Sequence, residues 1–209
     1  MTPDPHSFDA RARTWDDPIK ALRARHIADA IREMVPLTKE MSALEYGCGT
    51  GLLSFELKEY LGRITAADSS PGMFEVLREK IVASAVDNID PVKLDLMTDT
   101  SPVKDLDVIF SMLALHHVSD VQKVLGIFHS VLKTPGYLCI ADLDKEDGSF
   151  HGEGFAGHPG FDRNELTKMV TCAGFEKVRF KSVLEIEREM GTVKRTFPVF
   201  LMIAEKTRS

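Results

Sequence analysis

Three glycines at alternate positions, placed between a predicted strand and a predicted helix, constrain this chain more than any other feature. They lie in the run Leu44-Glu45-Tyr46-Gly47-Cys48-Gly49-Thr50-Gly51. Because glycine has no Cβ, each of them lets the backbone pack against a ligand where any other side chain would collide. A structural turn alone needs one or two glycines. The nicotinamide fingerprint, Gly-x-Gly-x-x-Gly, has its third glycine one residue later, so this run indicates another kind of binding loop.

Around this loop, short apolar runs alternate with segments of helical periodicity, which is typical of βαβ units on a parallel sheet. Strands are predicted at 41–46, 63–68, 92–96, 106–113 and 137–143, followed by a hairpin of strands 175–187 and 197–205 joined around Gly191. Helices are predicted at 17–35, at 51–61, from Pro71 onward, at 121–132, and between Asp162 and Gly174. We therefore expect an α/β fold, a Rossmann-like doubly wound sheet of about seven strands, mostly parallel, with a C-terminal antiparallel hairpin and helices on both faces.

Local signals make some of these predictions specific. In the helix over 17–35 the apolar residues expected on one side are Ile19, Leu22, Ile27, Ile31 and Met34. Ser70 is expected to cap the helix that begins at Pro71. Ser119 and Gln122 are expected to form a capping box before the helix over 121–132. Pro198 is expected at the start of its strand, because a proline within a sheet loses a ladder hydrogen bond.

Length and charge narrow the class of protein. The 209 residues suit one domain, 1–209, with an N-terminal lid and helix segment, 1–36, and a Rossmann-like core, 37–209. A net charge of −6 argues against a broad electrostatic grip on nucleic acid. No apolar run of about 18 residues predicts a membrane span, and residues 1–10 lack the pattern of a signal peptide. Three cysteines without paired spacing indicate a reducing compartment. We expect a cytoplasmic protein with neither nucleic acid nor membrane as partner, and the oligomeric state stays open.

Asp68 follows Gly51 by seventeen residues and ends the second predicted strand. A carboxylate at this place in a nucleotide-binding unit can accept hydrogen bonds from both hydroxyls of a ribose. Taken singly, an aspartate at a strand end is usually a turn or cap residue. Its register with the glycine loop makes Asp68 a candidate for ligand binding.

With these motifs the chain resembles the class I S-adenosylmethionine-dependent methyltransferases, and the resemblance covers nearly its whole length. Glu45, Gly47, Gly49 and Gly51 match the first motif of that family. Asp68 falls where the ribose-binding acid of the family lies, and Ser69 beside it is assigned to the same site. The resemblance therefore implies S-adenosylmethionine as the cofactor.

Three further segments support the same resemblance. In the run 93–96 it implies that the Asp95 side chain contacts the adenine amino group and the Leu96 amide contacts the ring. The run 111–118, which Ser111 opens, resembles the segment after the fourth strand of small-molecule members, and we assign Ser111 to the cofactor site. The run 131–138 departs from the usual Leu-Lys-Pro-Gly-Gly, because Pro135 is displaced by one residue and a glycine is missing. Phe8-Asp9 and Trp15-Asp16 resemble the segment that closes over the cofactor in ubiquinone- and biotin-pathway members.

The resemblance implies transfer of a methyl group to a small-molecule acceptor by in-line displacement. A neutral amine or a phenol also has to lose a proton, which calls for a general base. His116 and His117 follow the predicted central strand, at the edge where open α/β sheets bind ligands, and are the candidate catalytic residues. The alternative interpretation is that one packs under the sheet edge while the other caps the next helix.

The Gly- and His-rich loop over 144–160 is a second candidate region, with Asp142 immediately before it. Its polar residues are Asp144, His151, Glu153 and His158. Their spacing matches no defined metal motif, so we expect a solvated loop and no metal site.

Other functions stay open at this point. A non-catalytic S-adenosylmethionine-binding sensor or partner subunit would carry the same glycine motif, and so would a protein side-chain methyltransferase. Two absences from the sequence count against nucleic-acid substrates. No Asn/Asp-Pro-Pro-Tyr/Phe tetrapeptide follows the fourth predicted strand, and no basic or aromatic-rich appended domain is present.

Overall fold

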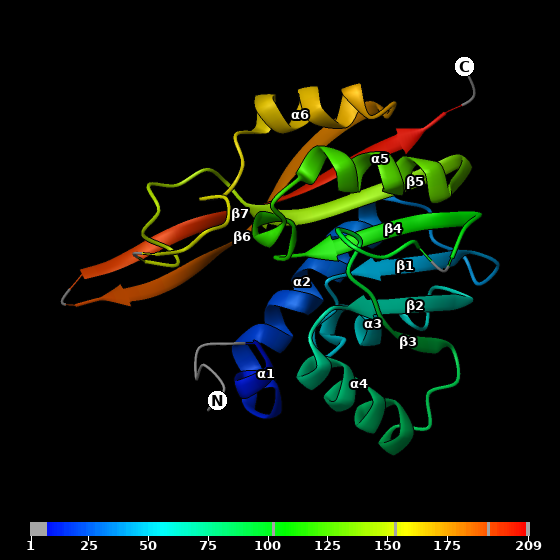
Figure 1. Ribbon diagram of the computed structural model, residues 1–209, viewed down its shortest axis with the longest axis horizontal. Helices are drawn as coiled ribbons and strands as arrows, with labels where there is room; N and C mark the ends of the chain where they lie inside the picture. Colours follow the sequence, from blue (N-terminus) through cyan, green and yellow to red (C-terminus); the bar gives the residue numbers. More distant parts are fainter. Residues whose placement is uncertain (1–7, 102, 153, 192, 208–209) are drawn as a thin grey trace.

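A seven-stranded sheet with the order β3-β2-β1-β4-β5-β7-β6 organises the chain (Figure 1). The computed structural model describes residues 8–101, 103–152, 154–191 and 193–207. Its strands are β1 Ser42–Tyr46, β2 Arg63–Asp68, β3 Ile89–Lys93, β4 Leu106–Met112, β5 Leu132–Leu143, β6 Glu176–Met190 and β7 Val193–Lys206. The first five strands pair in parallel, and β7 runs antiparallel between β5 and β6. The predicted fold class is confirmed.

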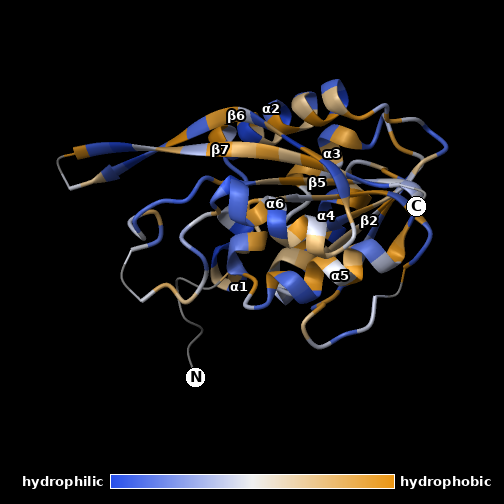
Figure 2. Ribbon diagram, turned by 90° about the horizontal axis from the view of Figure 1, so that it is seen from above, coloured by the Kyte–Doolittle hydropathy of each residue, from blue (hydrophilic) through white to orange (hydrophobic). Residues whose placement is uncertain are grey.

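Helices cover both faces of the sheet (Figure 2). They are α1 Phe8–Arg11, the 3-10 turn η1 Ala12–Thr14, α2 Pro18–Met34, α3 Leu52–Leu57, α4 Pro71–Ala83, the 3-10 turn η2 Leu115–His117, α5 Val121–Val131 and α6 Arg163–Cys172. Apolar residues of α2, α3 and α4 pack on one face, for example Ile31, Leu53 and Leu77. On the other face α5 and α6 bury Phe128 and Val170. Among the described residues, no helix combines the length and apolar character needed to cross a bilayer.

Side-chain caps set the helix starts. Ser70 accepts from the backbone N–H of Met73 and begins α4, as predicted, and Asp162 caps α6. The predicted capping box of Ser119 and Gln122 is wrong. Asp120 caps α5 instead, because its carboxylate accepts from the backbone N–H of Lys123 at 2.9 Å, so the helix begins after Asp120.

Only the second half of α2 packs as the sequence predicts. Ile27 and Ile31 are buried, whereas Ile19 is 64% and Leu22 is 50% exposed. The first turns of α2 extend past the carboxyl ends of the strands, so no sheet lies beneath them (Figure 1). The expectation of one continuous buried side was therefore wrong for Ile19 and Leu22.

Two strands, each containing a proline, begin earlier than the sequence pattern predicts. β3 occupies Ile89–Lys93 rather than 92–96, and it contains Pro91, which is tolerated because β3 is an edge strand. β5 begins at Leu132 rather than at residue 137, with an irregular register ahead of Tyr137 in place of a separate turn. α3 is also shorter than predicted and ends at Leu57.

The closing hairpin is longer than predicted and places Pro198 inside β7, which corrects the expectation of a strand start. The Pro198 carbonyl accepts from the backbone N–H of Asp144 at 2.9 Å. Because the N and O of one residue in an antiparallel strand point to the same side, the proline nitrogen also faces the Asp144 side. The pairing of β7 with β5 ends at Val199, so Pro198 removes no bond from the pairing with β6.

Beyond Val199 the hairpin continues as a two-stranded extension, residues 185–191 and 193–198, which we call the arm (Figure 1). Its inner side holds the loop over 144–160, where Phe150 packs on Phe197 with ring centroids 5.1 Å apart. Arg195 donates to the Ser149 hydroxyl at 2.7 Å and to the Asp147 carboxylate at 3.0 Å. The arm therefore positions this loop against the edge of the sheet.

Candidate active site

A cavity of about 660 Å³ lies at the carboxyl edge of the parallel strands. Its walls come from the segments after β1, β2, β3 and β4, from residues 8–23, from the loop over 144–160 and from the arm. This edge is where open α/β sheets bind their ligands, since the strand order reverses there. The topology thus brings the predicted motifs to one place.

The glycine loop divides into residues that face the cavity and one that faces the core. Gly47, Gly49 and Gly51 all have positive φ, at 69°, 54° and 81°, a conformation that glycine adopts without strain. Gly47 and Gly49 line the cavity, and a Cβ on Gly49 would lie 3.7 Å from Trp15 Nε1. A Cβ on Gly51 would instead come within 2.5 Å of Leu77 Cδ1. Gly51 therefore permits helix packing, whereas Gly49 leaves room for a ligand.

Asp68 and its neighbours form the polar end of the cavity. The Asp68 carboxylate accepts from the backbone N–H of Gly49 at 2.7 Å and of Ser70 at 2.8 Å, which ties the glycine loop to the end of β2. Burial raises the pKa of Asp68, although these two hydrogen bonds act against the shift. Ser69 and Asp95 also line the cavity.

Besides Gly51, three predicted cofactor residues lie outside the residues that line the cavity. Glu45 is fully buried, and its Oε2 accepts from the backbone N–H of Ser54 at 3.0 Å and from the Ser54 hydroxyl. Ser111 is buried and donates to the Tyr46 carbonyl at 2.9 Å. Leu96 packs in the core beneath α5. The structure gives each a local supporting role, and their contact with a cofactor stays a prediction.

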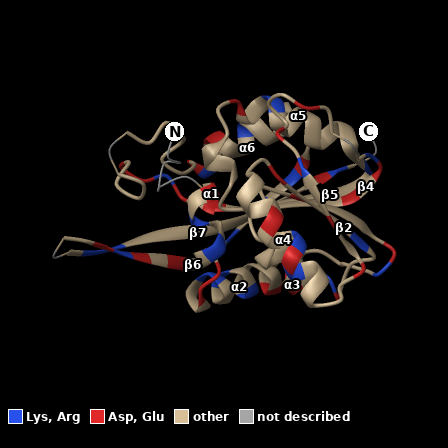
Figure 3. Cartoon of the chain, turned by 60° about the horizontal axis from the view of Figure 1, so that its bottom comes forward, with Lys and Arg blue, Asp and Glu red and all other residues tan. Residues whose placement is uncertain are grey.

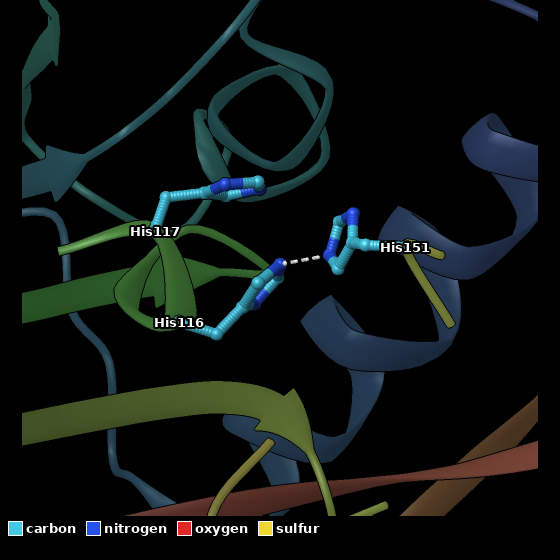
Figure 4. Close-up of side chains that lie close together, drawn as sticks. All are labelled: His116, His117 and His151. Carbon is cyan, nitrogen blue, oxygen red and sulfur yellow. Dashed lines mark hydrogen bonds between the residues drawn. The ribbon is translucent and has the colours of Figure 1, made fainter. Parts of the chain in front are cut away.

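The other end of the cavity is lined by histidines from two segments (Figure 4). His116 and His117 come from η2, directly after β4, and His151 comes from the loop over 144–160. His116 is buried, with its Nδ1 2.6 Å from Asp142 Oδ1, and its backbone N–H donates to Asp142 Oδ2 at 3.2 Å. His116 Nε2 lies 3.0 Å from His151 Nε2. The His151 ring stacks on Phe155, with centroids 3.9 Å apart.

Desolvation and mutual repulsion keep two of these rings neutral. Desolvation lowers the pKa of His117 to about 3, and the neighbouring His116 and His151 add to the shift. Desolvation lowers the pKa of His151 to about 4, and repulsion by His116, Arg188 and Arg11 adds to the shift. At pH 7 both rings therefore present lone pairs rather than charge.

Most of the loop candidates have structural partners. Asp144 forms a bidentate pair with Arg163, at 2.7 and 2.6 Å. His158 Nε2 lies 2.9 Å from the Val118 carbonyl. Glu153 lies outside the described residues. Of this group, the fold brings Asp142 and His151 to the candidate site.

A basic group that was not predicted from the sequence lies near the histidines of the cavity. Arg11, Arg23 and Arg188 line the cavity from α1, α2 and the arm. Burial lowers the pKa of Arg188, and repulsion by Arg23 and Arg11 lowers it further. Arg23 and Arg11 therefore lie close enough to Arg188 for their positive charges to repel it. Elsewhere both signs of charge are interspersed, as on α4 in Figure 3. No local pattern marks these three residues, because they come together only through the tertiary fold.

An N-terminal segment, residues 8–17, which we call the strap, lies along the start of α4. The Asp9 carboxylate accepts from the Ser70 hydroxyl and from the backbone N–H of Gly72 at 2.9 Å. Arg13 makes two hydrogen bonds of 2.8 Å to Glu79. Phe8, Arg11 and Trp15 of the strap line the cavity. Trp15 lies beside Gly49 at the polar end, whereas the Phe8 ring centroid lies 5.1 Å from that of His117, so the segment covers the cavity from one end toward the other.

Comparison with known proteins agrees with this geometry. A family model described as a methyltransferase domain matches residues 44–140. An uncharacterized methyltransferase of Schizosaccharomyces pombe is 33% identical over 139 residues, which are 58% of this chain and 48% of that protein. The ubiquinone biosynthesis O-methyltransferase of Coxiella burnetii is 25% identical over 157 residues, 69% of this chain and 67% of that one. A SAM-dependent methyltransferase from Aquifex aeolicus shares the fold, with a TM-score of 0.69 and 23% identity, covering 93% of this chain and 97% of that one. The chain spans about half the length of the S. pombe relative.

Proposed function

We propose that this chain is a class I S-adenosylmethionine-dependent methyltransferase, which the family model over residues 44–140 and the relatives support. It would transfer a methyl group from S-adenosylmethionine to a small-molecule acceptor. One observation carries the proposal: a cavity joins the glycine loop and Asp68 at one end to His116 and His117 at the other. The likeness to an O-methyltransferase of ubiquinone biosynthesis supports a small acceptor.

The polar end of the cavity fits S-adenosylmethionine in size and chemistry. A volume of about 660 Å³ lies within the range of about 300–1,000 Å³ for small-molecule sites. A Cβ on Gly49 would take up space inside the cavity, so the bare backbone there can contact a ligand. Asp68 offers carboxylate oxygens to a ribose, and Asp95 offers an acceptor for an amino group. When bound, S-adenosylmethionine supplies a methyl group that its sulfonium makes electrophilic.

His116 is the residue we assign to the acceptor's proton. The Asp142 carboxylate accepts only, so Nδ1 of a neutral His116 carries the hydrogen, and its Nε2 lone pair faces His151 Nε2 at 3.0 Å until an acceptor displaces that ring. His116 Nε2 can then accept a proton from a hydroxyl or amine on the acceptor. His117, neutral at pH 7, offers a second proton acceptor on the same wall. Holding both reactants in line lowers the activation barrier by up to about 7–11 kcal/mol.

The basic group narrows the acceptor class. Arg11, Arg23 and Arg188 concentrate positive charge at the end of the cavity that holds the histidines. A carboxylate or phosphate on the acceptor would relieve the repulsion among them. We therefore favour an acceptor that carries an anionic group as well as the atom to be methylated.

Calorimetric titration with S-adenosylhomocysteine, the demethylated product, tests the cofactor half. We expect one site per chain with micromolar affinity. Asp68→Ala should weaken the affinity more than tenfold, because a charged contact to the ribose is lost. Asp87→Ala, an exposed aspartate after α4, serves as the matched control. Unchanged affinity of the Asp68 variant would remove it from the site.

Transfer of a labelled methyl group tests turnover. Incubation with S-adenosylmethionine and a panel of phenols and amines, with and without a carboxylate, should label a small molecule. Tight product binding without transfer to any acceptor would favour a sensor or partner subunit instead. A labelled protein band would favour side-chain methylation of a protein.

A further inference from the structure

Three histidine side chains converge on one point of the cavity, although they come from two segments of the chain. Figure 4 shows His116 and His117 on η2 with their rings toward His151. One ligand atom from each of the three lies within 4.8 Å of those of the other two. We propose that His116, His117 and His151 bind a divalent transition-metal ion, Zn²⁺ or a metal of similar chemistry. The proposal departs from the expectation based on sequence spacing, because the third ligand lies 35 residues from His116.

The spacing of the ring nitrogens suits a metal. Zn–N bonds of about 2.0–2.1 Å in a tetrahedron place ligand nitrogens about 3.4 Å apart. His116 Nε2 and His151 Nε2 are 3.0 Å apart, so a small separation of the two rings admits the ion. His117 has to move to complete the set. The movement is short, because one of its ring nitrogens already lies within 4.8 Å of the ligand atoms of His116 and His151.

Asp142 supplies the outer contact that metal-binding histidines usually have. It is fully buried and lies 2.6 Å from His116 Nδ1, which leaves Nε2 as the ligand atom. Metal-binding histidines commonly donate their other ring N–H to a carboxylate, which fixes the tautomer and raises ligand basicity. His151 is oriented in a different way, by stacking on Phe155. Two of the three rings are thus held in place without the ion.

The donor set indicates the kind of metal and leaves one position open. Imidazole nitrogen suits Zn²⁺, Cu²⁺, Ni²⁺ and Fe²⁺ better than the hard ions Mg²⁺ and Ca²⁺. Three protein ligands with an open fourth position are typical of catalytic rather than structural zinc. Arg11 and Arg188 lie near enough to repel the ion, as they repel a charge on His151. An anionic acceptor would offset that repulsion, so we expect acceptor and metal to strengthen each other's binding.

The role of the ion in catalysis rests on the proposed methyl transfer, whereas its binding does not. With the ion present, the His116 Nε2 lone pair is no longer available as a base. An acceptor hydroxyl in the open position would instead lose its proton to solvent, because the ion lowers its pKa. The oxygen then forms the new O–CH₃ bond while the C–S bond breaks and its electron pair returns to sulfur, which cancels the sulfonium charge.

Zinc titration of the untagged 209-residue chain, followed by calorimetry, tests the site directly. We expect one Zn²⁺ per chain in the wild type. His151→Ala and His117→Ala should weaken binding about 100-fold, since each removes a ligand, and Asp142→Asn should weaken it about 10–100-fold. His26→Ala, an exposed histidine on α2, is the matched control and should bind like the wild type. Circular dichroism of each variant checks that it is folded.

Cobalt spectroscopy identifies the ligands. Co²⁺ in the wild type should give the visible bands of a tetrahedral nitrogen and oxygen site, and these should disappear in His151→Ala. A thiolate charge-transfer band would assign the metal to an exposed cysteine such as Cys172 and overturn the proposal. Zinc affinity unchanged in both the His117 and His151 variants would overturn it as well.

Measuring S-adenosylhomocysteine in the same samples keeps the two proposals separate. Product binding without saturable zinc binding overturns the metal site and leaves the proposed function in place. Zinc binding lost on His151→Ala, in a protein that never binds the product, supports the metal site and overturns the proposed function.

Discussion

Glu45 is a fully buried carboxylate whose Oε1 has no hydrogen-bond partner among the described residues. Burial raises its pKa to about 8, although hydrogen bonds from Ser54 act against the shift. Between pH 4.5 and 8 the unfolded chain loses this proton while the folded chain keeps it. The contribution of Glu45 to stability is therefore full below about pH 4.5 and is lost as the pH rises toward 8, on the order of 1 kcal/mol per pH unit.

Glu45→Gln should remove this pH dependence. We expect the variant to have a higher free energy of unfolding than the wild type at pH 8, and the difference should shrink toward pH 5. Urea denaturation at several pH values measures it. Glu75→Gln, an exposed carboxylate on α4, controls for the loss of one charge. A constant difference between Glu45→Gln and the wild type across this range would contradict the burial argument.

Substitution of two glycines of the same motif should have different effects, one on product binding and the other on stability. Gly49→Ala keeps a positive φ at a strain of about 1 kcal/mol and places its Cβ in the cavity, so we expect lost product binding in a folded protein. Gly51→Ala drives its Cβ toward Leu77, so we expect a larger loss of stability. Calorimetry with S-adenosylhomocysteine and thermal melting of both variants separate the two effects. Equal melting temperatures and equal affinities for the pair would contradict this division.

Single residues were predictable where a motif fixes their place. Asp68 is a candidate through its spacing from the glycine loop, Asp95 through the family resemblance, and His116 through its place after the central strand. All three line the cavity, and their roles stay predictions. Arg23 and Arg188 were not predicted, because they come from α2 and from the arm, which only the tertiary fold brings together. His151 was found as part of a candidate loop, but its partners were not.

At the level of elements, the strap forms the cover of the cofactor end, and its contacts to α4 are mostly charged and exposed. Asp9→Ala removes the acceptor that holds Ser70 and the Gly72 N–H. We expect faster dissociation of S-adenosylhomocysteine, by several fold, and faster tryptic cleavage at Arg11 and Arg13. Stopped-flow displacement and timed proteolysis measure the two effects. Dissociation at the wild-type rate in this variant would show that the strap does not hold the ligand in.

Elements were predictable where apolar periodicity and caps agree, as for β2 and α4. The prediction was wrong where tertiary context decides. The capping of α5 by Asp120, the place of Pro91 in an edge strand and the first turns of α2 all depend on neighbours distant in sequence. The predicted strands of the hairpin stop short of most of the arm. Its exposed residues lack the alternation of apolar and polar residues that marks a half-buried strand.

At the level of the whole molecule, an acidic protein presents a basic cavity. The net charge is −6, yet three arginines meet at the acceptor end. Arg23→Gln should weaken the binding of carboxylate-bearing acceptors about tenfold and leave their uncharged analogues unaffected. Arg25 lies on the same helix as Arg23, and its guanidinium is 3.7 Å from Glu56 of α3, so Arg25→Gln is the matched control. Equal losses for charged and uncharged acceptors would indicate a general change of shape.

The arm has a consequence for how such a protein diversifies. The arm and the loop that it holds lie outside residues 44–140, the stretch that matches the methyltransferase domain model. These two segments contribute His151, Phe155 and Arg188 to the cavity, while the glycine loop and Asp68 lie within the matched stretch. Mutation of the arm and its loop can therefore change the acceptor without disturbing the cofactor end. Exchange of the arm and its loop as one unit between relatives should therefore change which acceptor is bound.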